Sequence, residues 1–128
     1  MAGSNVVLDK GYISTGTLAT LYLPVKFGAV DGAVVAPTAV TDVIVGVAQE
    51  ICLAADAGKR VVSVRKLGLS LMVAKGAITR GDRVKLDPTF TGIVTAGTAA
   101  DVVLGLAEES AVSGDQIHVM LAPGGLKV

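Results

Sequence analysis

Short runs of alternating apolar and polar residues, separated by turn residues at intervals of about ten residues, constrain the fold of this chain more than any other feature. The run Ala19 to Phe27 places its leucines, its valine and its phenylalanine on one face, and the run Arg83 to Asp87 alternates without a fault. Alternation with a period of two predicts a strand with one buried face. Many such strands predict an all-β fold, a small β-barrel or sandwich-like domain.

Three segments give more local expectations. Pro24 cannot donate a hydrogen bond to a strand ladder, so its strand is expected at an edge or a bulge. The continuous apolar run Val43 to Glu50 predicts a strand that is covered on both faces. The segment Ala48 to Arg60 favours a short helix closed by Gly58.

The chain also contains a short internal sequence repeat, which we call the echo. VIVGVAQE at Val43 to Glu50 and VVLGLAEE at Val102 to Glu109 match in register, with an offset of 59 residues between Gly46 and Gly105. Each copy is followed by a glycine turn and a strand. Two explanations are open: a gene duplication, or repeated use of the same turn-to-strand chemistry in a chain rich in valine and glycine.

The length of 128 residues is that of one domain. Residues 1–10 hold the apolar triplet Val6-Val7-Leu8 between polar flanks, and we expect them to form an extended N-terminal arm. Residues 11–128 are expected to form a single β-rich domain. The alternative for the triplet is a first strand within the chain's own barrel.

Charge and hydropathy exclude several classes of protein. Eleven basic and eleven acidic residues give a net charge of zero with no basic stripe, so no nucleic-acid partner is expected. No uncharged apolar stretch approaches the roughly 20 residues that a membrane span needs, and no signal peptide is apparent. We therefore expect no membrane partner and a chain that stays in the cytosol or in something assembled there. Zero net charge with 52% apolar residues predicts self-association.

Residue types that carry chemistry are sparse. The single cysteine, Cys52, excludes a multi-cysteine metal site, and His118 lies in an alternating run without partners for catalysis. Glu108 and Glu109 are adjacent and would point to opposite faces of a strand. The aspartates flank turns, where short polar side chains commonly cap backbone groups: Asp82, Asp87, Asp101 and Asp115. The sequence predicts no catalytic residue, no metal and no cofactor, and hence no enzyme.

The order of the turns and strands in the second half resembles the capsid cement (head decoration) family of tailed bacteriophages. An Ala/Gly-Ile-x-x-Gly-Asp turn enters a strand, a hairpin follows, and then come a V-x-G-x-A-x-E element, a Gly-Asp turn and a final strand that ends in Leu-Ala. The matching pieces are Ala77 to Asp82, Val84 to Leu86, Val103 to Glu109, Gly114-Asp115 and Ile117 to Ala122. With VIVGVAQE and Val61 to Val64 as the first half, the resemblance runs from about Val43 to Ala122, while Met1 to Asp42 departs from the family's pattern.

This resemblance implies a β-rich decoration protein, usually a homotrimer, on the outer surface of a phage head. Its partners would be the major capsid protein and its sister copies, and its location the virion, assembled in the host cytoplasm. From the arm we expect the capsid contact: Ser4, Asn5, Val6, Val7 and Leu8. Two alternatives are another virion component, in head completion or the tail, and a β-barrel ligand or carrier module, which would lack a lysine displayed in the expected Met-Lys setting.

Overall fold

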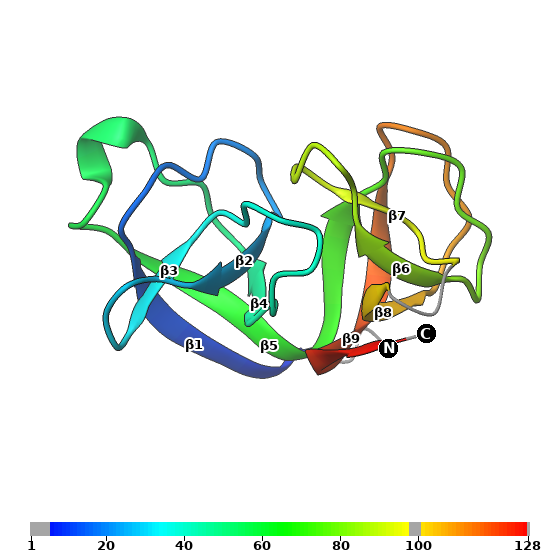
Figure 1. The fold of residues 1–128 in the computed structure, drawn as a ribbon, viewed down its shortest axis with the longest axis horizontal. Coiled ribbons are helices and arrows are strands. Elements are labelled where there is room, and N and C mark those ends of the chain that lie inside the picture. The colour runs from blue at the N-terminus through cyan, green and yellow to red at the C-terminus, as the bar shows by residue number, and fades with distance from the viewer. Residues whose placement is uncertain (1–5, 98–100, 128) are drawn as a thin grey trace.

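The computed structural model describes residues 6–97 and 101–127, and it forms two β lobes that lie side by side (Figure 1). The prediction of an all-β fold is confirmed. The elements are β1 (Val6–Ser14), β2 (Pro24–Phe27), β3 (Ala33–Val35), β4 (Gly46–Ala48), a 3-10 turn η1 (Ala54–Asp56), β5 (Val61–Val73), β6 (Arg83–Leu86), β7 (Ile93–Thr95), β8 (Val102–Ala107) and β9 (Gln116–Lys127).

The first lobe is a closed five-stranded barrel. Around it, β1 pairs with β3, β3 with β2, β2 with β4, β4 with β5, and β5 again with β1. All of these pairings are antiparallel except β1 with β3, where Ile13 lies opposite Ala33 in a parallel bridge. Closure removes the exposed sheet edges over the paired part of the strands.

The second lobe repeats this ring in the order β5, β9, β8, β6 and β7. An isolated parallel bridge from Ala74 to Ile93 joins the end of β5 to β7 and completes the ring. The long strand β5 is therefore a wall of both lobes, and in Figure 1 it runs from one lobe into the other. Gly68, with a φ of 100°, lies in this strand between the part that pairs with β4 and the part that pairs with β9.

Each lobe has its own apolar core, and one element contributes to both. Val62 and Val64 of β5 are buried in the first core, and Met72 of the same strand is buried in the second. Ile44 and Val47 come from the first half of the chain and yet pack in the second core. The two lobes thus share a strand and part of a core.

The two lobes have the same register as well as the same strand order, with an offset of 59 residues in β2, β3 and β4. Lys26 pairs with Val35 and Lys85 with Val94; Val25 pairs with Gly46 and Val84 with Gly105. The isolated bridges Leu18 to Cys52 and Ile78 to Ala111 also correspond. A repeated turn motif alone would not reproduce five strands in register, so we interpret the echo as a duplicated five-stranded unit.

Polar contacts recur at the same places in both units. The ion pair Lys26–Asp42, at 3.1 Å, has its counterpart in Lys85–Asp101, at 3.0 Å. The carboxylate of Glu50 accepts the N–H of Ser63, as that of Glu109 accepts the N–H of His118, each at 2.9 Å. The identical glutamate that closes each copy of the echo therefore holds the next strand of its own lobe.

The echo's identical glycines have a steric explanation. A Cβ added to Gly46 would overlap the carbonyl oxygen of Arg65, and one added to Gly105 would overlap that of Met120. In both lobes the fourth strand crosses its neighbour too closely for any side chain, so only glycine fits.

Several local expectations are confirmed and others are corrected. Residues Ile44 to Ala48 are all buried, as the apolar run predicts. The edge or bulge expected at Pro24 is wrong, because β2 pairs with both β3 and β4 without a register shift. The strand accommodates Pro24 as its first residue, a position that proline tolerates. The alternating run Ala19 to Phe27 is a strand only from Pro24 onward, because the chain turns at Tyr22, whose φ is 57°. The helix expected over Ala48 to Arg60 is wrong: only the three-residue turn η1 forms, and none of its residues is buried. Cys52 instead exchanges two backbone hydrogen bonds with Leu18 in an antiparallel bridge, which a helix at this position would not allow.

The arm expected over residues 1–10 is corrected in part. Val6 to Lys10 belong to β1, where Val6 lies opposite Gly68 and Lys10 opposite Val64. The alternative of a first strand within the chain's own barrel therefore holds for this part of the segment. Met1 to Asn5 lie outside the described residues, so the arm stays a prediction for them.

Candidate functional site

The predicted contact segment is split by the start of β1. Ser4 and Asn5 lie outside the described residues, whereas Val6, Val7 and Leu8 are in the strand. Between Val6 and Asp9 the pairing with β5 shifts register, and the side chain of Leu8 is 44% exposed. Leu8 is thus available for a contact, and the role of all five residues in binding stays a prediction.

The aspartates stabilise turns, as their positions predict. Asp82 accepts the N–H of Thr79 at 2.9 Å, and Asp115 accepts that of Val112 at 3.1 Å. Asp101 accepts the N–H of Gly97 at 2.9 Å and pairs with Lys85.

Asp87 is the most buried of these carboxylates, at 3% exposed. It accepts the backbone N–H groups of Thr89, Thr91 and Gly92 and the hydroxyl of Thr89. Desolvation by burial acts to raise the pKa of Asp87, but these hydrogen bonds outweigh it, so that the pKa is lowered. This carboxylate is a structural group that holds the turn between β6 and β7.

His118 and Cys52 lie in different environments. The imidazole Nδ1 of His118 lies 3.4 Å from a carboxylate oxygen of Glu109, at the surface, and Cys52 is buried in the first core. Across residues 6–97 and 101–127, no group of three or more His, Cys, Asp or Glu side chains is placed to hold a metal ion.

The outer face of the second lobe carries an apolar patch. Leu69 lies opposite Met120, which in turn lies opposite Leu106 on the other side, and Leu71 is two residues from Leu69 on the same face of β5. Met120 is 45% exposed and Leu106 41% exposed. We call Leu69, Leu71, Leu106 and Met120 the outer apolar patch. Contiguous apolar surface of this kind commonly marks a contact with another protein.

The open end of the first barrel forms a second feature, which we call the barrel mouth. It is a pocket of about 340 Å3 lined by Lys10 and Tyr12 of β1, Lys66 of β5, Phe27 at the end of β2, and the loop 28–32 that leads to β3. The ring of Tyr12 closes the bottom, because its side chain is only 3% exposed. Phe27 meets it edge to face, with ring centroids 6.3 Å apart.

Two ammonium groups flank the ring of Tyr12 in the barrel mouth. The Nζ atom of Lys10 lies 5.1 Å from the ring centroid, and that of Lys66 lies 5.5 Å from it and donates to the Tyr12 hydroxyl at 2.8 Å. Both distances are within the range of cation–π contacts. The barrel mouth therefore combines two positive charges with an aromatic floor and a partly apolar rim.

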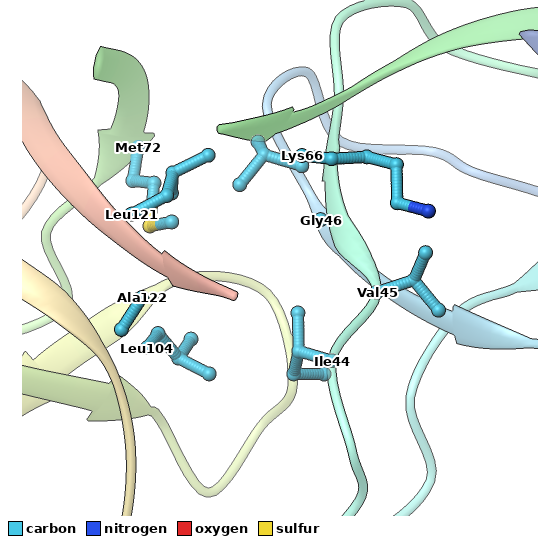
Figure 2. Close-up of a pocket in the computed structure, with 9 residues that line it drawn as sticks. Ile44, Val45, Gly46, Lys66, Met72, Leu104, Leu121 and Ala122 are labelled. Carbon is cyan, nitrogen blue, oxygen red and sulfur yellow. The ribbon is translucent and has the colours of Figure 1, made fainter. Parts of the chain in front are cut away.

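A smaller hollow lies between the two lobes (Figure 2). Ile44 and Val45 line it from the first half of the chain, and Met72, Leu104 and Leu121 from the second. Its volume is about 10 Å3, which is near the minimum for one water molecule. It is a small gap in the packing between the lobes and has no room for a ligand.

Sequence reasoning did not identify the barrel mouth. The sequence places Lys10 in the N-terminal arm, whereas in the structure the residues around it come from β1, β2 and β5, which closure of the barrel brings together. The only sequence signal is weak: the repeat places polar residues in the first unit where the second unit has apolar ones, as at Lys66 and Leu121.

No protein-family model and no curated protein matches this chain. Among solved structures, the fold is similar to the crystal structure of the N base of head fiber gp8.5 in bacteriophage phi29, with a TM-score of 0.69 and 16% identity. The match covers 94% of this chain and 98% of that chain. The part of the chain that the structure describes contains no helix of the length and hydropathy that crossing a membrane requires. The likeness to the phi29 protein establishes a shared fold over nearly the whole of both chains.

Proposed function

We propose that this chain is a structural component of a tailed-phage head and, more specifically, a decoration (cement) protein on the outer surface of the capsid. The observation that carries the proposal is the fold shared with the phi29 head fiber N base, which extends over almost all of both chains. The cement-like order of turns and strands from Val43 to Ala122 supports it independently. In this proposal the chain binds the major capsid protein and has no enzymatic activity.

The surface of the molecule supports an assembly role. Large apolar side chains are exposed on both lobes, among them Phe27 and Val61 on the first and Met120 on the second. Such side chains in water favour association. A subunit of this size that repeats as a trimer would contact several capsid chains at once, and linking weak contacts raises the overall affinity by roughly 10² to 10⁴.

The mechanism is mechanical. A cement subunit binds across a joint between capsid subunits, so that the joint opens only if the subunit's contacts break first. The barrels suit this role, because their closed hydrogen-bond rings resist unravelling from an edge.

A second candidate is a base that anchors a fiber to the head, which is favoured by the description of the phi29 neighbour as an N base. Electron microscopy of particles would separate the two: a compact knob at each binding site indicates cement, and an elongated projection indicates a fiber base.

The first test concerns the predicted contact segment. Removal of residues 2–5 leaves β1 intact, so we expect a folded protein with unchanged oligomeric state that binds expanded, undecorated heads more weakly in a sedimentation assay. As a matched control, L53S replaces the exposed apolar side chain of Leu53, directly before η1, and should leave binding to heads unchanged. Equal binding by the deletion variant and the full chain would reject the contact role of the N-terminal segment.

A further inference from the structure

The second lobe offers a comparison for the barrel mouth, because it contains residues at the equivalent positions. The register of the two units makes Ser70, Met72, Leu86 and Leu121 the counterparts of Lys10, Tyr12, Phe27 and Lys66. In the second lobe this end is filled: Leu86 is 1% exposed, and Phe90 and Leu121 pack against the core. In the first lobe Phe27 is 58% exposed and the pocket is open.

The ammonium groups of Lys10 and Lys66 differ in their partners from several other basic groups of this chain. Lys26, Arg60, Arg65 and Lys85 each form an ion pair with a carboxylate of this chain. Within residues 6–97 and 101–127, neither Lys10 nor Lys66 forms one, although Asp31 lines the same pocket. Two ammonium groups around one ring leave a positive site that an incoming carboxylate would complement.

The backbone beside the pocket is also open for pairing. Ile13 donates its N–H to Gly32 on the β3 side of β1, at 2.9 Å. Because backbone groups alternate along a strand, Gly11 and Asp9 direct their N–H and C=O groups toward this same side. The pairing of β1 with β3 covers only Ile13 and Ser14, so among residues 6–97 and 101–127 no strand pairs with this edge at Gly11 and Asp9. An extended peptide can add to an edge of this kind.

We propose that the barrel mouth binds an extended, acidic segment of a partner protein. The segment's backbone pairs with β1 at Asp9 and Gly11, an Asp or Glu carboxylate lies between Lys10 and Lys66, and an apolar neighbour packs on Phe27. The pocket volume, about 340 Å3, accommodates a few side chains. This inference does not depend on the proposed role in a phage head, because any protein with such a segment would fit.

The test uses the full chain and a capped pentapeptide, Thr-Val-Glu-Val-Thr, followed by NMR of backbone amides. We expect shifts that cluster at Gly11, Tyr12 and the loop 28–32. The same peptide with Gln in place of Glu should bind about tenfold more weakly, because it loses a charge-assisted hydrogen bond. The variant K10Q/K66Q should lose the preference for Glu.

The matched control is K59Q/K75Q, which removes two exposed lysines elsewhere and changes the net charge equally. It should bind the Glu peptide as the unmodified chain does. Since Lys66 also contacts Tyr12, K10Q alone serves as a second variant, and K10E should favour a peptide with a central Lys.

Equal binding of the Glu and Gln peptides, or unchanged binding by K10Q and K10Q/K66Q, would overturn the proposal. So would binding of N-acetylglutamate amide as tight as that of the pentapeptide, because this would indicate an anion site without strand pairing. None of these results bears on whether the chain binds phage heads, which the sedimentation assay measures separately.

Discussion

The carboxylate of Asp87 is the polar centre of the turn between β6 and β7. It accepts three backbone N–H groups, of which that of Gly92 is buried and those of Thr89 and Thr91 are partly buried. We expect D87A to lower the free energy of unfolding by about 2–3 kcal/mol, because it leaves these donors without an acceptor. Chemical denaturation at pH 7 measures the change, with D31A, at an exposed position, as a control near zero.

The pH dependence of this effect follows from the lowered pKa of Asp87. A carboxylate whose pKa is lower in the folded state stabilises the protein above its unfolded pKa of about 4 and loses this contribution as the pH falls through the folded value. The difference between D87N and the unmodified chain should therefore be full at pH 7 and shrink below pH 4. A difference that grows on acidification would contradict this assignment.

Substitutions at Gly46 and Gly105 test whether both lobes contain the same close strand crossing. Each substitution G46A and G105A forces a methyl group against a carbonyl oxygen of the neighbouring strand, and we expect a loss of about 1–3 kcal/mol from each. G97A, where a Cβ would meet nothing within 4 Å, should be nearly neutral. Thermal unfolding of the three variants measures this, and a neutral G46A or G105A would contradict the close strand crossing.

At the scale of elements, β5 couples the two lobes. It supplies Val64 to the first core and Met72 to the second, and Val47 of β4 packs in the second core as well. We expect one cooperative unfolding transition, because neither lobe keeps its ring or its core without β5.

The check is denaturation followed by NMR, with amide signals from β2 and β6 as separate probes. In V64A and in M72A, both probes should shift to the same lower midpoint, with a loss of about 2–4 kcal/mol in each case. Two separate transitions, with only the mutated lobe affected, would show that the lobes are independent.

Strand existence was predictable where a single face is apolar, and much less so elsewhere. The alternation in Arg83 to Asp87 and the glycine-containing echo mark β6, β4 and β8. In β5, by contrast, Leu69 and Leu71 are as apolar as Met72, so alternation cannot tell which face is inside; the structure buries Met72 and places the leucines outward. Closure of each ring depends on the parallel bridges Ile13–Ala33 and Ala74–Ile93, which no local pattern encodes.

At the scale of the whole molecule, the sequence predicts one domain, and the structure shows a duplicated unit with one strand in common. The echo alone leaves duplication and repeated turn chemistry open as explanations, because two units in the same register are visible only when the pairings are known. The barrel mouth could not be predicted from the sequence for the same reason. Lys10 and Lys66 are 56 residues apart in sequence, and only the folded chain brings both to the ring of Tyr12.

The proposed role in a phage head is a claim about the assembled particle. Purified chain should be mixed with expanded, undecorated heads of the phage that this proposal implies, and the product imaged by cryo-electron microscopy. We predict saturable density on the outer surface, at joints between capsid subunits, with a two-lobed subunit fitting each copy. Heads that stay bare at saturating protein, or density confined to the tail, would contradict the account.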